Sequence, residues 1–199
     1  MTTRRGAIAR VAGAVLAVVT LAGCSGSGNG APAGQSFVAG DGAVTLLPPS
    51  QRPRPGTLRG ATVDGRTIDL AAQKGHAVVL NVWGSWCAPC QKEAPALEKA
   101  SQELAAEGVR FIGINTRENG NKDAAAAFQR AYGITYPSLF DAGGDALLAL
   151  RGAVSANAIP TTVVVDPQGR IAARISGATT TDTLVGLVDD VLAGRTQAS

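Results

Sequence analysis

Hydrophobic residues in this chain form short runs that alternate with segments of helical spacing. The runs at 77–83 and 109–115 are almost wholly apolar, which is typical of strands buried on both faces of a sheet. Helical spacing follows the first run at 88–107, and the segment 138–141 is short and extended. The other predicted elements are strands at 161–165 and 170–176 and helices at 122–132, 146–150 and 181–192.

Two turn signals divide this pattern into hairpins. Asp64-Gly65 lies between the strand-like segments 57–61 and 66–70. The sequence Asp-Pro-Gln-Gly lies between the last two predicted strands and favours a turn. Alternating strands and helices that finish with a hairpin and a helix predict an α/β sandwich. We assign this domain to residues 56–194, with a short tail at 195–199.

The first 23 residues have the pattern of an export signal. Three arginines precede an apolar stretch that ends at Leu21 and is too short to predict a transmembrane helix. The sequence Leu-Ala-Gly-Cys at 21–24 resembles a bacterial lipobox, in which the cysteine is acylated and becomes the first mature residue. We therefore predict a signal peptide at 1–23 and a lipid anchor on Cys24, at the extracytoplasmic face of the cell membrane. Ordinary secretory cleavage near Gly23 is the alternative.

Composition distinguishes the segment before the domain from the domain itself. Residues 24–55 are rich in glycine, serine and proline, cannot bury a core and predict a flexible tether. Three of the 18 lysines and arginines lie in the predicted signal peptide, so the mature chain is formally neutral against its 15 acids. The sequence shows no basic patch with interleaved aromatic residues, and we predict no nucleic-acid partner.

The most distinctive chemistry lies in the sequence Trp-Cys-Ala-Pro-Cys at 86–90, directly after a predicted buried strand. A helix begins here, and its free N–H groups and positive partial charge favour ionisation of a thiol to the reactive thiolate. With Cys24 lipidated, Cys87 and Cys90 are the remaining pair, and an exported compartment permits disulfides. The pair is therefore a candidate two-electron redox centre. Pro89 fits a helix start, where its missing N–H costs little.

These motifs together resemble the thioredoxin fold, and specifically the TlpA/ResA-type extracytoplasmic thiol–disulfide oxidoreductases, over residues 56–194. A strand leads into the two cysteines and a helix, and Pro95 stands where the family kinks that helix. Ile159-Pro160 before a strand resembles the family's cis-proline segment. The resemblance implies an α/β, thioredoxin-like fold: a three-layer α/β/α sandwich with an N-terminal β-hairpin and a central strand–helix insertion.

The resemblance also implies roles for the residues around the cysteines. Cys87 would attack a partner disulfide, and Cys90 would resolve the mixed disulfide that forms. Trp86, Ile159 and Pro160 would bind the substrate, with Pro160 in the cis form placing the Ile159 backbone beside Cys87. For Trp86, simple packing is an equal alternative.

Further residues would support the site. Asn81 occupies the position of a buried aspartate in thioredoxin, and we predict a satisfied buried amide there. Glu93 matches the family's buried acid and would accept or pass a proton, whereas a solvated surface glutamate is the alternative. Pro89 and Pro95 would shape the helix that carries the cysteines.

The leading hypothesis is a membrane-tethered protein disulfide reductase that needs no cofactor. In the family, such proteins keep thiols reduced outside the cytoplasm, and a common substrate is the CxxCH disulfide of apocytochrome c. Electrons would come from a membrane thiol carrier of the CcdA or DsbD type. An exported disulfide-forming oxidase of the same fold is the alternative. A copper-binding chaperone is more remote because no histidine follows Cys90, and one CxxC has too few ligands for zinc, so we predict no metal site.

Overall fold

The fold is organised around one strand, β5 (Val78–Trp83), whose six residues are all buried, as the apolar run predicts. Strand β5 pairs in parallel with β6 (Arg110–Thr116) and antiparallel with β8 (Thr161–Val165). Burial on both faces follows from this central place in the sheet. The structure is a computed structural model that describes residues 36–39, 43–155 and 157–196.

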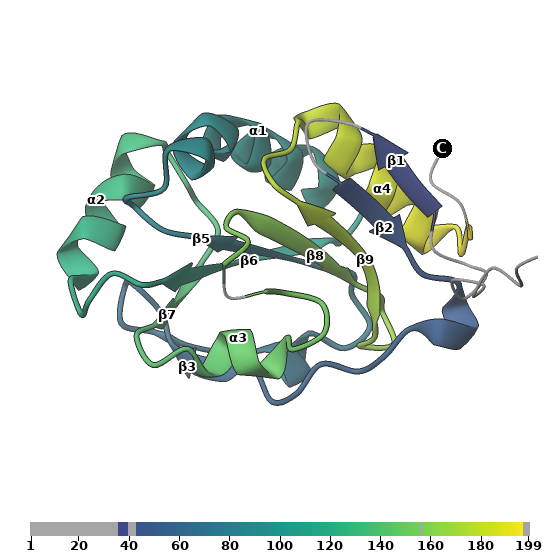
Figure 1. The fold of residues 1–199 in the computed structure, drawn as a ribbon, viewed down its shortest axis with the longest axis horizontal. Coiled ribbons are helices and arrows are strands. Elements are labelled where there is room, and N and C mark those ends of the chain that lie inside the picture. The colour runs from purple at the N-terminus through teal and green to yellow at the C-terminus, as the bar shows by residue number, and fades with distance from the viewer. Residues whose placement is uncertain (1–35, 40–42, 156, 197–199) are drawn as a thin grey trace, which may run out of the picture. The chain divides into compact units, whose positions relative to one another are not determined.

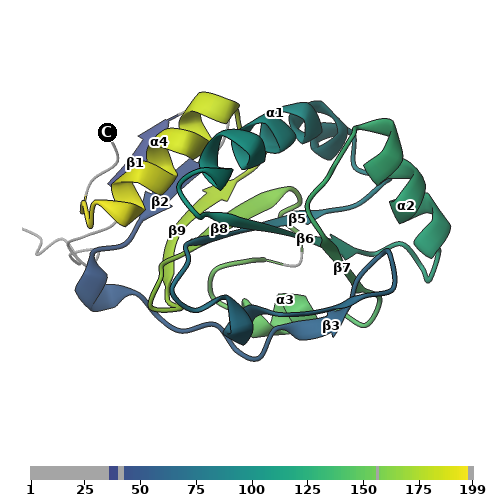
Figure 2. The same cartoon turned by 180° about the vertical axis from the view of Figure 1, so that it is seen from behind.

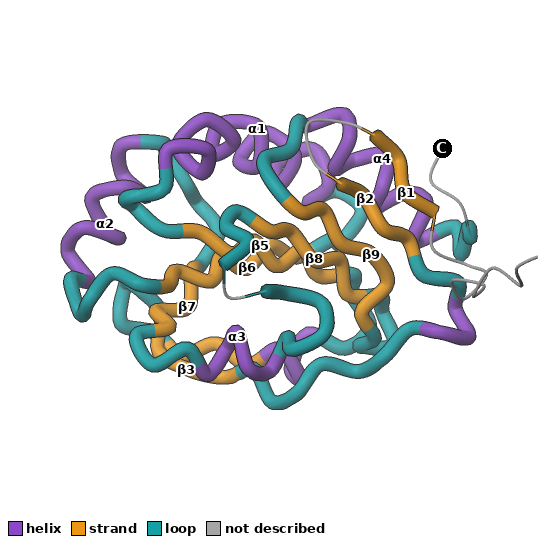
Figure 3. The backbone as a smooth tube through the Cα atoms, viewed as in Figure 1, coloured by secondary structure: helices purple, strands orange, loops and turns teal. Residues whose placement is uncertain are grey.

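Within the described residues, the main sheet has seven strands in the order β1-β2-β9-β8-β5-β6-β7 (Figure 3). Strands β5, β6 and β7 run parallel to one another, and the other neighbours pair antiparallel. The hairpin predicted at Asp64-Gly65 forms a separate two-stranded sheet, β3-β4. The remaining strands are β1 (Ser36–Ala39), β2 (Ala43–Leu46), β3 (Arg59–Ala61), β4 (Thr67–Asp69), β7 (Ser138–Asp141) and β9 (Ile171–Ser176).

The α-helices of the described chain lie close to their predicted bounds. Two of them begin at polar caps: the side chain of Asn121 accepts the N–H of Ala124, and that of Thr180 accepts the N–H of Thr183. The helices are α1 (Ala88–Ala105), α2 (Lys122–Ala131), α3 (Asp145–Ala149) and α4 (Thr181–Leu192).

Different elements cover the two faces of the sheet, which gives the layers expected of the fold (Figures 1 and 2). Helices α1 and α4 lie on one face, where Val79 of β5 packs in a cluster with Leu97 and Leu184. Helix α3 and the β3-β4 hairpin lie on the other face, where Leu80 packs in a cluster with Leu150. Successive residues of β5 therefore point to opposite layers, and the residues that share the face of Val79 point toward α1.

The domain begins earlier than the sequence pattern predicts. Strand β2 pairs with β9, and Leu46 is fully buried opposite Ala173. Arg52 is also buried, and its Nη1 lies 3.3 Å from Oδ2 of Asp166. The predicted tether at 24–55 is therefore wrong in its second half. The sequence pattern missed β2 because the strand is short and stands just before a pair of prolines. The proline and glycine around it dominate the composition of the segment.

The predicted N-terminal features lie outside the described residues. These features are the signal peptide at 1–23, Cys24 with its lipid anchor, and the tether as far as residue 35. The same holds for the last three residues of the tail. Within the part of the chain that the structure describes, no helix is long and apolar enough to cross a membrane.

Candidate active site

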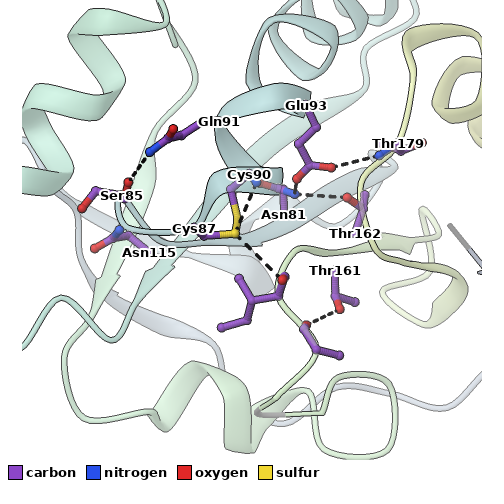
Figure 4. Close-up of a disulfide and its surroundings, with 12 residues drawn as sticks. Asn81, Ser85, Cys87, Cys90, Gln91, Glu93, Asn115, Thr161, Thr162 and Thr179 are labelled. Carbon is purple, nitrogen blue, oxygen red and sulfur yellow. Dashed lines mark hydrogen bonds between the residues drawn. A yellow bond between two sulfur atoms is a disulfide. The ribbon is translucent and has the colours of Figure 1, made fainter. Parts of the chain in front are cut away.

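The two cysteines lie at the N-terminus of α1, where the chain leaves β5 and turns into the helix (Figure 4). They form a disulfide with an S–S distance of 2.04 Å and a Cα–Cα distance of 5.2 Å. Cys87 is the N-cap residue, and its Sγ accepts a hydrogen bond of 3.2 Å from the backbone N–H of Cys90. Pro89 stands in the first turn of the helix, and Pro95 lies inside it. The redox pair therefore occupies the helix start that the sequence predicts.

Access to the sulfur atoms is narrow, and one aromatic residue borders it. Cys87 is 3% exposed and Cys90 is 1% exposed, whereas Trp86 is 51% exposed. A Cβ added at Gly84 would lie 2.6 Å from Nε1 of Trp86, so the missing side chain lets the indole lie against the loop. Trp86 is thus seated on the loop while about half of its surface faces solvent.

The loop before β8 forms the other side of the disulfide. The Ile159–Pro160 peptide bond is cis, as predicted. The carbonyl oxygen of Ile159 lies 3.9 Å from Sγ of Cys87, although the two residues are 72 positions apart in the sequence. Thr161 Oγ1 donates a hydrogen bond of 2.6 Å to the carbonyl of Ala158, which ties this loop to the start of β8. The fold thus brings together the residues that the sequence assigns to nucleophile and substrate contact.

A buried polar network lies near the disulfide, between β5, α1 and β8 (Figure 4). Glu93 is 2% exposed and accepts hydrogen bonds from Asn81 Nδ2 at 2.9 Å and from the backbone N–H of Thr179 at 3.1 Å. Asn81 Nδ2 also donates to Thr162 Oγ1 at 3.2 Å. The prediction of a satisfied buried amide at Asn81 is confirmed. The surface alternative for Glu93 is wrong, because a segment far along the chain closes over the carboxyl group.

The environment of Glu93 changes its acidity. Burial raises the pKa of Glu93 to about 7, against the lowering effect of the hydrogen bonds from Asn81 and Thr179. Its carboxyl group therefore changes charge near neutral pH, where an ordinary glutamate is fully ionised. Glu93 follows Cys90 by three positions on the same helix, which places a titratable proton one turn from the redox pair.

Sequence reasoning missed Glu118, which fixes the loop before the cysteines. Its buried carboxylate accepts hydrogen bonds from Ser85 N–H at 2.6 Å, Ser85 Oγ at 2.8 Å and Asn115 Nδ2 at 2.8 Å. The carbonyl of Ser85 accepts a further bond of 3.0 Å from Gln91 Nε2 (Figure 4). A signal existed, because Glu118 follows β6, and the carboxyl ends of parallel neighbours such as β5 and β6 meet at one sheet edge.

Other groups with metal-binding potential are dispersed. Within the residues that the structure describes, no three His, Cys, Asp or Glu side chains gather in a group that could hold a metal ion. The histidine at position 76 has its Nδ1 2.9 Å from the carbonyl oxygen of Gly108. The chemistry that the Cys87–Cys90 disulfide offers is thiol–disulfide exchange, and the buried carboxyl group of Glu93 lies on the same helix.

The fold and the dithiol together define the class of the protein as a thiol–disulfide oxidoreductase with a thioredoxin-like fold. The Redoxin family model matches residues 27–192. The chain is 29% identical over 133 residues to the thiol–disulfide oxidoreductase ResA of Bacillus subtilis (strain 168), across 67% of this chain and 71% of ResA. For ResA of Bacillus anthracis, identity is 30% over 129 residues, across 65% and 71%. The chain therefore belongs to the Redoxin family, as a thiol–disulfide oxidoreductase of the ResA type.

Solved structures share the architecture. A secreted thiol–disulfide isomerase from Corynebacterium glutamicum matches with a TM-score of 0.69 and 32% identity, over 80% of this chain and 96% of that one. A DsbF homologue from Corynebacterium diphtheriae matches with a TM-score of 0.66 and 30% identity, over 81% and 96%. The predicted thioredoxin-like fold of class α/β is thereby confirmed.

Proposed function

We propose that the protein reduces disulfide bonds of other proteins on the extracytoplasmic side of the cell membrane. The observation that carries the proposal is the dithiol at the start of α1, with the Ile159 carbonyl 3.9 Å from Cys87 Sγ. A sulfur beside a loop backbone suits a substrate polypeptide in extended form, because main-chain contacts then hold the substrate disulfide at the nucleophile. Relatives of the ResA type support the redox class.

Reduction would proceed by two exchanges at sulfur. The Cys87 thiolate attacks one sulfur of the substrate disulfide, that S–S bond breaks, and the released substrate thiolate takes up a proton. The Cys90 thiolate then attacks the Cys87 sulfur, the mixed disulfide breaks, and the second substrate thiol leaves. Two electrons pass to the substrate, and the protein ends with the Cys87–Cys90 disulfide.

The surroundings of the two cysteines match their proposed roles, with Cys87 as the attacking and Cys90 as the resolving residue. Cys87 borders the substrate loop and receives the N–H of Cys90, which favours its thiolate at the helix N-terminus. Cys90 is the more deeply buried of the two and lies within the first turn of α1. From there it reaches the Cys87 sulfur directly, as the disulfide shows.

The buried carboxyl group of Glu93 supports the reducing direction. Once ionised above its pKa of about 7, it places a negative charge on the same helix as the cysteines, one turn beyond Cys90. Like charges disfavour each other, so this carboxylate opposes thiolates and favours the disulfide form of the pair. A protein whose disulfide form is favoured gives its electrons readily to a substrate.

The exchange itself and the family support a proposal for the physiological setting. Each turnover leaves the protein oxidised, so it requires an electron donor, for which we propose a membrane thiol carrier of the CcdA or DsbD type. A candidate substrate is the CxxCH disulfide of apocytochrome c. Acylation of Cys24 would hold the domain beside such a carrier. Replacing Cys24 by serine should move the protein from the membrane fraction to the soluble fraction, and continued membrane association would contradict the anchor.

Trapping of the mixed disulfide tests the proposed roles. The Cys90→Ser protein, reduced and mixed with a disulfide-bonded polypeptide, should accumulate a covalent adduct through Cys87 that dithiothreitol releases. The matched Cys87→Ser protein should form little adduct, because Cys90 is 1% exposed. Adduct formation through Cys90 alone would reverse the assignment.

A disulfide-forming oxidase is the second candidate, and one observation favours it. The hydrogen bond from the Cys90 N–H to Cys87 Sγ stabilises a thiolate, and a stabilised reduced form makes a disulfide more oxidising. This hydrogen bond stabilises the thiolate and the Glu93 carboxylate opposes it, and the balance of the two effects decides whether the pair reduces or oxidises its substrates. The reduction potential of the pair measures that balance.

A further inference from the structure

A depression lies between the loop that follows β6 and the segment 142–154, which includes α3. Its volume is about 680 Å³. We call it the arginine pocket because two arginines line it together with apolar side chains. Its lining includes Arg117, Asn119, Leu147, Leu148, Arg151 and Val154.

Two contacts connect the arginine pocket to the active site. Arg117 Nη2 donates a hydrogen bond of 3.1 Å to Oδ1 of Asn157, which lies two residues before Ile159 in the substrate loop. Glu118, the next residue after Arg117, binds the N–H and Oγ of Ser85 in the loop before the cysteines. Arg117 therefore stands where both sides of the active site meet the pocket.

In the loop after β6, the backbone turns Glu118 inward and its two neighbours, Arg117 and Asn119, outward. Arg117 has φ of 59° and Asn119 has φ of 50°, a left-handed conformation that is uncommon for residues other than glycine. Glu118 between them is 7% exposed and points to Ser85, whereas its two neighbours are exposed and line the pocket. The hydrogen bonds of Glu118 hold the turn that presents Arg117 and Asn119 at the pocket wall.

The side chains that line the pocket suit a ligand that is both acidic and apolar. Arg117 and Arg151 are the charged groups among the described residues that line it. The nearby carboxylates of Glu118 and Asp141 are buried and accept hydrogen bonds from other groups, and Asp145 lies beside the lining residue Gly143. Leu148 is 66% exposed, an unusual degree for a large apolar side chain, and it lines the pocket together with Leu147. In a ligand with a carboxylate beside an apolar side chain, the carboxylate would pair with the arginines and the apolar side chain would cover Leu148.

We propose that the arginine pocket binds the residues that flank the disulfide of a substrate polypeptide, and that it selects flanks in which acidic and apolar residues adjoin. This inference rests on the proposed function, because it requires a polypeptide disulfide held at Cys87. Binding there would seat one part of the substrate in the pocket while its disulfide lies against Ile159.

The test uses two peptides that differ only in charge. Each contains one disulfide ring, flanked on both sides by Glu-Leu in one peptide and by Lys-Leu in the other. Oxidation of the reduced full-length protein by each peptide is followed in single turnover at low salt. We expect the acidic peptide to react about tenfold faster, in keeping with two exposed charge pairs, and the ratio to fall toward one at high salt.

Variants assign the preference to the pocket. Arg117→Asn combined with Arg151→Gln should bring the ratio of the two rates close to one; asparagine tolerates the positive φ at position 117. If the double variant does not fold, Arg151→Gln alone should lower the ratio about threefold. Arg110→Gln is the matched control, because Arg110 is exposed at the opposite end of β6 and should keep the full preference.

The outcomes separate the inference from the proposed function. Equal rates for the two peptides, or a preference that survives loss of both arginines, would overturn the arginine pocket while leaving a working reductase. Failure of the protein to react with either peptide would overturn the proposed function and the pocket with it.

Discussion

At the residue scale, Glu93 couples the charge of the site to pH. The sequence places a carboxyl group inside α1, and the fold closes β5 and the Thr179 segment over it, so that only 2% of the residue is exposed. Burial disfavours the ionised form more strongly than two hydrogen bonds favour it, which is why the pKa rises to about 7.

This shift predicts how stability depends on pH. The folded protein holds the Glu93 proton more tightly than the unfolded chain, whose glutamate has a pKa near 4.5. The stabilising contribution is therefore complete below pH 4.5 and is lost as the pH rises through about 7, a decrease of about 3 kcal/mol. Urea unfolding of the oxidised protein at several pH values between 4.5 and 8 measures the decrease.

The Glu93→Gln protein is the comparison for that series. Glutamine does not titrate, so the difference in unfolding free energy between the natural protein and the variant should change with pH over the same interval. Parallel profiles for the two proteins would show that Glu93 does not titrate there.

Glu118 supports a second prediction at this scale. Its carboxylate accepts from Ser85 twice and from Asn115 once, and a glutamine amide would lose the negative charge that strengthens all three hydrogen bonds. Glu118→Gln should cost about 2 kcal/mol in unfolding free energy and slow the reaction with a peptide disulfide. The control is Glu103→Gln. Glu103 lies in α1, is exposed and pairs only with the exposed Lys99 in the part of the chain that the structure describes, so its replacement should cost less than about 0.5 kcal/mol. Equal costs for the two variants would contradict the role of Glu118.

At the scale of elements, the start of α1 and the loop before β8 carry the chemistry because the sheet brings them together. Strand β5 ends directly before the loop that carries Cys87, and its antiparallel neighbour β8 begins directly after Pro160. Antiparallel pairing therefore places the start of β8 beside the end of β5. The neighbouring parallel strand β6 ends at the same edge, and Glu118 follows it.

Strand β2 gives a prediction at the scale of elements. Leu46 is fully buried where β2 pairs with β9, so Leu46→Ala should lower the unfolding free energy by about 3 kcal/mol. Leu192→Ala, at a leucine that is 41% exposed at the end of α4, should cost much less. Denaturant unfolding measures both. A cost at Leu46 no larger than that at Leu192 would mean that β2 does not belong to the packed domain.

At the scale of the whole molecule, the sequence predicts what local patterns encode. Continuous burial of β5 and β6 leaves apolar runs, and the helix start at Cys87 leaves a strand followed by a CxxC pair, so both the layers and the redox pair were predictable. The surroundings of Glu93 and Glu118 were less accessible, because their partners come from other segments. The arginine pocket likewise depends on segments that are distant in the sequence.

The reduction potential of the Cys87–Cys90 pair tests the central claim most directly. The purified full-length protein would be equilibrated with dithiothreitol or glutathione buffers at pH 7, and the fraction of disulfide measured. We expect a value near or below that of thioredoxin, about −270 mV, as suits a reductase. A value near that of a strong oxidant, about −120 mV, would contradict it and make the protein a disulfide-forming enzyme.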